Sequence, residues 1–259
     1  MTRFTRWLAE RTGNSFSDYR QLHQWSVDHL EEFWAFCLEY SGIQCDGSPD
    51  PVVSQLEMPG ARWFRGLSLN YAENLLRGDP SATAILYQVE GQLPLAGDGG
   101  RIGKIDFGTL RTEVSRCAGA LAKVGIRRGD RVAGYLANVP EAIIAALACA
   151  AIGATWSSAS PDFGLDAVCD RFSQVEPRVV FASSHYRYSG KTFHTDSVVT
   201  QLKSRLPSVR TIVSVPYPVG EARPAGDVNW EGFLESGEGT SLSFERFPFD
   251  HPLFILFSS

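Results

Sequence analysis

The chain has 259 residues, of which 44% are hydrophobic and 20% charged, a composition that can bury a sizeable core and differs from that of a disordered chain. The formal net charge of −5 argues against a nucleic-acid partner, because neutralising phosphates takes clustered Lys and Arg. The sequence has neither a signal-peptide pattern nor an apolar run that could span a bilayer, so no membrane partner is expected. Cysteines without a C-x-x-C pair favour a reducing, cytoplasmic location.

The N-terminal region is predicted to be helical and then extended. Residues 15–42 carry apolar side chains at the 3.6-residue period of a helix with one buried face. Gly42 is typical of a helix end. Residues 43–70 are rich in Gly, Pro, Asn and Ser, which favours an extended connection, and residues 70–76 form a short amphipathic segment.

From residue 82 onward, predicted strands alternate with predicted helices. Asp106 can cap one helix that ends before Gly125, and Pro140 is typical of the first turn of the next. The expected strands are residues 82–89, 131–136, 154–157, 178–182, 211–215 and 254–257, and the expected helices are residues 106–124, 140–152 and 165–175. This alternation favours an α/β fold in which βαβ units form a largely parallel sheet. Residues 216–248 are expected to be a long surface excursion.

Parallel sheets bind ligands beyond the carboxyl ends of their strands. A binding site is therefore expected in the loops that follow residues 136, 157, 182, 215 and 257. In the second of these loops, Ser160 and Asp162 are expected to initiate a helix, because helix starts favour side-chain oxygen acceptors.

Three stretches resemble one group of enzymes. Residues 58–76 look like the segment that joins the N-terminal helical cap of short-chain acyl-CoA synthetases to their main domain, and residues 129–158 are similar to the adenylate-forming superfamily in general. The run Ser-Pro-Asp-Phe-Gly at residues 160–164, followed by residues 170–177, resembles acetoacetyl-CoA synthetases more than acetyl-CoA synthetases. The likeness covers nearly the whole chain.

The resemblance implies the front part of the large domain of adenylate-forming enzymes. It implies a helical cap and linker at residues 1–76, then an incomplete AMP-binding domain at residues 77–259. The implied reaction is the ATP-dependent adenylation of acetoacetate followed by thioester formation with CoA, with ATP, CoA and Mg²⁺ as cofactors of the full-length enzyme.

Two candidate binding segments follow from the resemblance. Ser258 and Ser259 match the opening of the family's ATP-phosphate loop, although without the family they would be the polar end of a buried strand. The segment 185–191 matches the loop that holds the phosphate and adenosine end of CoA, with Arg187, Gly190 and Lys191 as contacts. Its alternative interpretation is a solvated basic loop. No metal site is expected, because the histidines lack ligand spacing.

The family's adenylation Lys and most of its phosphate loop have no counterpart in the chain. We therefore expect no catalytic residue in it, inactivity when it is alone, no tightly bound cofactor and self-association through an unpaired sheet edge. Two alternatives to the acetoacetate ligase stay open. One is a ligase for another short acid such as acetate, propionate or butyrate, and the other is a non-catalytic module that binds CoA or a protein.

Overall fold

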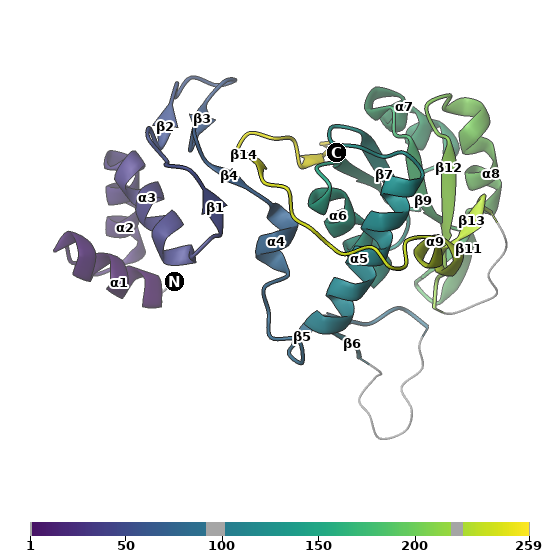
Figure 1. Ribbon diagram of the computed structural model, residues 1–259, viewed down its shortest axis with the longest axis horizontal. Coiled ribbons are helices and arrows are strands. Elements are labelled where there is room, and N and C mark those ends of the chain that lie inside the picture. The colour runs from purple at the N-terminus through teal and green to yellow at the C-terminus, as the bar shows by residue number, and fades with distance from the viewer. Residues whose placement is uncertain (1, 92–101, 219–224, 259) are drawn as a thin grey trace. The chain divides into compact units, whose positions relative to one another are not determined.

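The computed structural model describes residues 2–91, 102–218 and 225–258 (Figure 1). Contacts group the chain into two compact units. The first comprises Met1–Leu69 with Arg246–His251, and the second comprises Asn70–Glu245 with Pro252–Ser259. The division at residues 69/70 lies close to the boundary expected after residue 76, which stays a prediction. None of the described helices is long and apolar enough to cross a membrane.

In its described residues, the first unit combines three helices with one three-stranded sheet and one strand pair. Its elements are α1 (Thr2–Thr12), α2 (Tyr19–Asp28), α3 (Leu30–Ser41), β1 (Cys45–Asp46), β2 (Val53–Ser54), β3 (Arg62–Trp63), β4 (Ser68–Leu69) and β14 (Phe247–Pro248). The helix predicted over residues 15–42 is two helices, because His29 ends α2 and precedes α3. Gly42 ends α3 at φ 58°, a left-handed conformation that favours glycine, so that prediction is confirmed.

The second unit contains the main sheet and its helices. Its elements are α4 (Tyr71–Leu75), β5 (Thr83–Tyr87), β6 (Gly103–Asp106), α5 (Phe107–Lys123), β7 (Arg131–Tyr135), α6 (Pro140–Ala151), β8 (Thr155–Ala159), α7 (Leu165–Val175), β9 (Val179–Ser183), β10 (His185–Tyr188), β11 (Lys191–His194), α8 (Asp196–Arg205), β12 (Thr211–Val215), β13 (Val228–Asn229), α9 (Trp230–Ser236) and β15 (Phe254–Ile255). Six strands form one sheet in the order β13-β12-β9-β7-β8-β15, and each neighbouring pair is parallel. The predicted α/β fold with a parallel sheet is confirmed.

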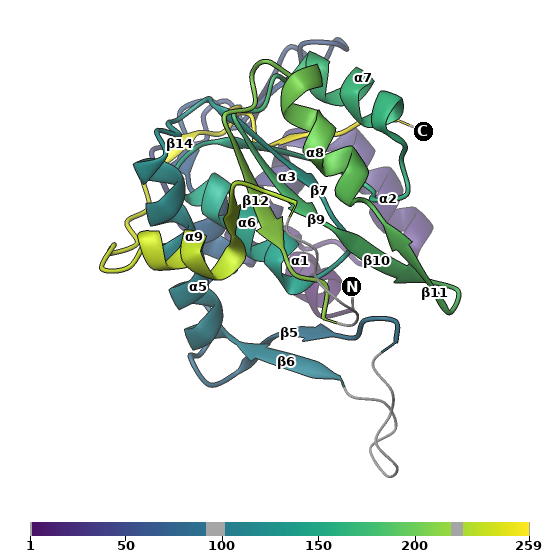
Figure 2. The same cartoon turned by 90° about the vertical axis from the view of Figure 1, so that its right-hand side faces the viewer.

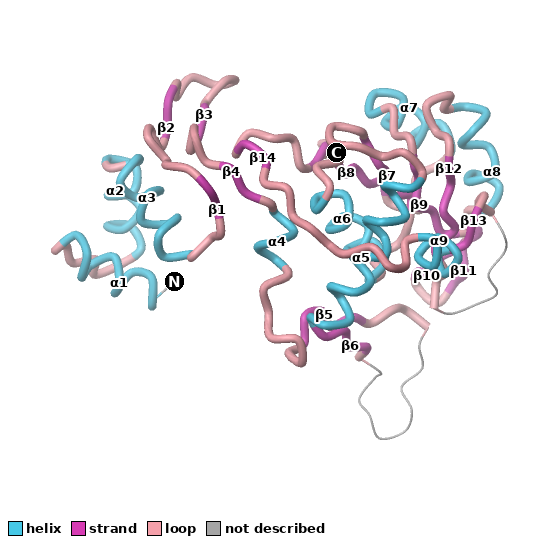
Figure 3. The backbone as a smooth tube through the Cα atoms, in the orientation of Figure 1, coloured by secondary structure: helices cyan, strands magenta, loops and turns pink. Residues whose placement is uncertain are grey.

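Helices cover both faces of this sheet, as Figures 2 and 3 show. Alternation along β9 explains how: Val179 and Phe181 pack on the side of α5, α6 and α9, while Val180 and Ala182 pack on the side of α7 and α8. Successive side chains of a strand point to opposite faces, so a strand buried on both faces is a continuous apolar run. The Phe181 ring meets that of Phe233, on α9, edge to face with ring centroids 5.6 Å apart.

One buried side chain joins separate elements of this unit. Asn70 is fully buried, and its Oδ1 accepts hydrogen bonds from the N–H groups of Ala72 and Glu73 at the start of α4. Its Nδ2 donates to the carbonyl oxygens of Ala151, at the end of α6, and Glu245. The same amide therefore caps the start of one helix and the end of another.

Two predicted loops differ from the structure. Helix α7 begins at Leu165 with Gly164 as its N-cap, so Ser160 and Asp162 do not start it. Residues 216–248 are more than a surface excursion, because α9 in this range buries Trp230 and two neighbouring apolar side chains.

Candidate functional site

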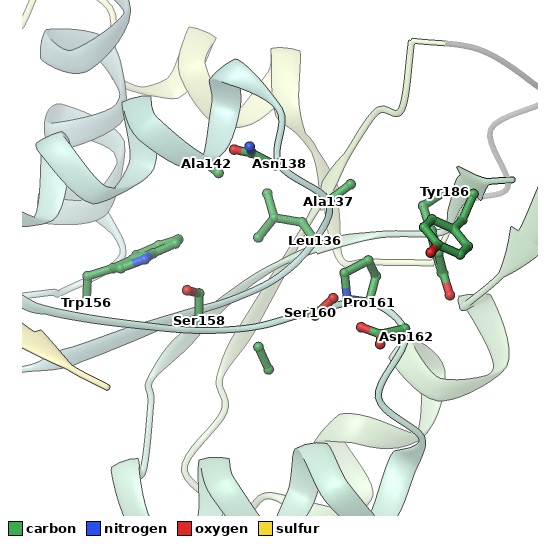
Figure 4. A pocket seen from close by; sticks show the side chains of 12 residues that line it. Leu136, Ala137, Asn138, Ala142, Trp156, Ser158, Ser160, Pro161, Asp162 and Tyr186 are labelled. Carbon is green, nitrogen blue, oxygen red and sulfur yellow. The ribbon is translucent and has the colours of Figure 1, made fainter. Parts of the chain in front are cut away.

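A pocket of about 690 Å³ lies at the carboxyl ends of β7, β8 and β9 (Figure 4). Three segments line it: residues 136–138 after β7, residues 158–162 at the end of β8, and the hairpin after β9, with Trp156 and Ala142 completing the wall. In Figure 4, Trp156 lies on one side and Tyr186 on the other. This pocket lies among the loops that follow the parallel strands, where a binding site is expected from the sequence.

The strand order explains why a hollow forms here. After β7 the chain crosses to β8, whereas β9 lies on the other side of β7 and is followed by β12 still further out. The connections after β7 and β9 therefore leave the sheet in opposite directions, which opens a crevice at the carboxyl ends of these neighbouring strands.

Tyr135, the last residue of β7, anchors one wall of the pocket. Its side chain is 1% exposed, and its hydroxyl donates to the carbonyl oxygens of Pro161 and Phe163 at 3.0 and 2.8 Å. Burial raises the pKa of Tyr135 to about 12 because it disfavours the phenolate. The guanidinium of Arg171, on α7, lies 4.4 Å from the centre of the Phe163 ring. These contacts hold residues 161–163 in place and prevent Asp162 from capping α7.

The chemistry of the pocket lining is mostly apolar with a few polar groups. Ser158 and Ser160 contribute hydroxyls, Asn138 an amide and Asp162 a carboxylate. The pKa of Tyr186 is raised by desolvation and by the Asp162 carboxylate. Such a lining suits a ligand with a long apolar part and few hydrogen-bonding groups.

The segment 185–191, expected to be a loop, lies in the hairpin of β10 and β11. Cross-strand partners share a face, and the register pairs Tyr188 with Lys191 and Arg187 with Thr192. Lys191 is therefore on the same face as the pocket-lining Tyr186 and Tyr188, whereas Arg187 is on the opposite face. The two predicted cations lie close in sequence but do not face the same side.

The turn of this hairpin contains Gly190. Ser189 and Gly190 have φ values of 50° and 77°, as in the two-residue turns that match strand twist. Arg187 donates from Nη2 to the Gly190 carbonyl at 3.2 Å. Its Nε is buried and finds no acceptor within residues 2–91, 102–218 and 225–258.

Ser258 follows the edge strand β15. Two β8 hydroxyls hold this strand: Ser157 Oγ donates to the Ile255 carbonyl at 2.9 Å, and Thr155 Oγ1 donates to the Pro252 carbonyl at 3.3 Å. Ser258 is exposed, and Ser259 lies outside the described residues. Strand β15 thus delivers Ser258 to the same carboxyl edge of the sheet as the pocket.

Several residues of the pocket carry no local sequence signal that assigns them to a site. Tyr135 and Leu136 are predicted only as strand residues, and residues 137–138 only as part of a loop in which a site is expected. The sequence predicts no site role for Tyr186 and Tyr188, and the signal that could have assigned them to the pocket is their period-2 alternation with Arg187. Among the described residues, no group of three His, Cys, Asp or Glu side chains could hold a metal ion.

Comparison with known proteins gives matches over most of the chain. Residues 74–259 match the family described as AMP-binding enzyme, and residues 19–75 match the acetyl-coenzyme A synthetase N-terminus. An acetoacetyl-CoA synthetase of Rattus norvegicus is 39% identical over 272 aligned residues, which cover 100% of this chain and 39% of the relative. A malonamoyl-CoA synthetase of Penicillium aethiopicum is 34% identical, covering 100% of this chain and 37% of the relative.

A solved structure is also similar to this chain over nearly its whole length. The acetoacetyl-CoA synthetase from Streptomyces lividans superimposes with a TM-score of 0.88 at 39% identity, covering 99% of this chain and 39% of that one. The chain therefore spans about two fifths of the length of the proteins it resembles.

Proposed function

Since the chain belongs to the AMP-binding enzyme family, we propose that it supplies the CoA-facing part of an acetoacetate–CoA ligase. In the proposed reaction, acetoacetate and ATP give an acyl-adenylate and pyrophosphate. The CoA thiolate then displaces AMP, forming the thioester. The relatives named as acetoacetyl-CoA synthetases support this choice of acid.

The observation that carries the proposal is the pocket at the switch point together with the hairpin that lines it. CoA has a long arm in which short apolar runs alternate with two amides and a hydroxyl, and it has several phosphates at its other end. The pocket, apolar with a few hydroxyl and amide groups, suits the arm, and Lys191 on the same hairpin face suits a phosphate. Arg187 and Gly190 are proposed as further phosphate contacts.

The ATP site is proposed to begin at Ser258 and Ser259, whose hydroxyls would donate to phosphate oxygens and offset their charge. Ser258 fits this role because it is exposed at the carboxyl edge of the sheet. Mg²⁺ would neutralise further phosphate charge in the full-length enzyme. No residue of the described ranges is assigned to it, because they contain no suitable group of ligands.

Three further proposals concern the chain as a whole. We propose that residues 1–76 form the cap and linker and residues 77–259 the start of the adenylation domain. A cytoplasmic location is supported by Cys117 and Cys149, which are free thiols within the core. Self-association would use the edge strand β15 and the residue that follows it, Leu256, which is 80% exposed.

The acid itself has one alternative that an observation favours. The Penicillium relative is named for malonamoyl-CoA, so chains this similar are named for different acids. A ligase for acetate, propionate or butyrate would keep the same CoA site and change only the acyl pocket.

The test is thioester formation by the full-length protein with ATP, CoA and a panel of short acids. The highest kcat/KM is expected with acetoacetate. A higher value with another acid would replace the substrate and keep the reaction. CoA binding without any acid-dependent thioester would refute the ligase and favour a non-catalytic CoA module.

A further inference from the structure

The turn between β10 and β11 binds a carboxylate of the same chain. Glu90, which follows β5 and the buried Val89, accepts a hydrogen bond from the Ser189 N–H through Oε2 at 3.0 Å and one from the Gly190 N–H through Oε1. One carboxylate therefore engages two successive N–H groups, one oxygen to each.

These two N–H groups have the geometry of an anion site. Ser189 and Gly190 both have positive φ, and successive N–H groups in such turns converge into a concavity that binds anions. Arg187 and Lys191 flank the turn on either side in the sequence. The oxygen pair of Glu90 occupies the place that two phosphate oxygens would take.

Two contacts of its backbone also hold the segment around Glu90 in place, one with Tyr217 after β12 and one with the hairpin. Tyr217 donates from its hydroxyl to the Glu90 carbonyl at 3.3 Å. Gly91 has φ 93° and packs against the Arg187 guanidinium so closely that a Cβ there would be 2.5 Å from Nη1. The same segment therefore occupies the turn through Glu90 and packs against the Arg187 guanidinium through Gly91.

We infer that Glu90 is an internal anion that competes with a phosphate of CoA for the hairpin turn, and so sets the affinity and selectivity of that site. The inference rests on the proposed CoA function. When the carboxylate leaves, the N–H groups of Ser189 and Gly190 are both freed and become available to a phosphate.

If Glu90 had only a structural role in the turn, its removal would have the opposite effect on CoA affinity. If Glu90 only ordered the turn, its removal would loosen the donors and weaken CoA binding. If it competes, its removal tightens CoA binding, because apparent affinity is reduced by the fraction of molecules whose site is open.

The test is titration of the chain with CoA, followed by the amide NMR signals of Ser189 and Gly190, in the wild type, Glu90→Ala and Glu90→Gln. Glu90→Ala should tighten CoA binding by about tenfold. Glu90→Gln, which loses the charge but keeps one acceptor oxygen, should give an intermediate affinity. Adenosine, which carries no phosphate, should bind all three alike. As a control, Glu238→Ala removes an exposed carboxylate from the turn that follows α9. This variant should bind CoA with the affinity of the wild type.

The other possible results of this titration either contradict the inference or support it. Equal or weaker CoA binding by Glu90→Ala overturns the inference, and the proposed function stands if the wild type binds. Glu90→Gln equal to the wild type also overturns it, because the negative charge of Glu90 would then have no effect on CoA binding. Binding by neither protein overturns both the inference and the CoA site, whereas binding by the variant alone supports the inference.

Discussion

Removing the hydroxyl of Tyr135 should loosen the pocket wall and make stability depend on pH in a calculable way. Tyr135→Phe loses the hydrogen bonds to the carbonyls of Pro161 and Phe163 and leaves these oxygens without that donor. A lost hydrogen bond with an unsatisfied partner costs about 1–3 kcal/mol. We expect the variant to be about 2 kcal/mol less stable at pH 8.

The difference should shrink at alkaline pH. The folded pKa of Tyr135 is raised from 10.0 to about 12, so the fold favours the neutral phenol. This contribution is fully present below pH 10 and is lost as pH rises through the folded pKa. Between pH 8 and pH 11.5 the wild type should therefore lose about 2 kcal/mol of its free energy of unfolding through this group, since one unit of pKa is worth about 1.4 kcal/mol. The phenylalanine variant has no phenol at this position and should lose nothing through it.

The assay is urea unfolding of both proteins at pH 8 and pH 11.5, with Tyr19→Phe as the control. Tyr19 is 65% exposed, so its substitution should change stability little at pH 8. If Tyr135→Phe cost no more than this control at pH 8, the hydrogen bonds would not anchor the wall. If the difference between wild type and variant stayed the same at both pH values, the account of the buried phenol would be refuted.

Two further predictions concern side chains that hold the elements around the pocket. Asn70→Ala should cost about 3 kcal/mol in urea unfolding, because it removes a helix cap and two buried amide donations, whereas Asn229→Ala removes only a cap and should cost about 1 kcal/mol. Equal costs would contradict the double role of Asn70. Ser157→Ala should speed amide hydrogen exchange in residues 254–257 about fivefold by removing the bond to Ile255, with unchanged exchange as the contrary result.

Local signals in the sequence predicted much of the fold. Asp106 accepts a hydrogen bond from the Thr109 N–H at the start of α5, and Pro140 opens α6, as their residue types indicate. The strands β9 and β12 lie within two residues of their predicted bounds because buried β-branched runs bounded by Pro or charged residues are strong signals. Such features depend only on nearby residues.

The site depended on contacts that are distant in sequence. The pairing of Glu90 with the turn at Ser189 joins residues about a hundred positions apart, and no local pattern indicates it. The opposite faces of Arg187 and Lys191 follow from the register of a turn that places a non-glycine residue at positive φ. Asp162 satisfies a helix-start pattern, but the buried hydroxyl of Tyr135 holds its loop elsewhere.

The most direct test of the central claim is a calorimetric titration of the full-length protein with CoA. Wild type is compared with the double variant Arg187→Ala/Lys191→Ala and with the control pair Lys104→Ala/Arg210→Ala, which removes the same charge from exposed positions. The first pair should weaken CoA binding at least about tenfold, since charged hydrogen bonds to phosphate are each worth about 1.5–3 kcal/mol. The control pair should bind as the wild type does. Unchanged affinity in the Arg187→Ala/Lys191→Ala variant would contradict a CoA site at this hairpin.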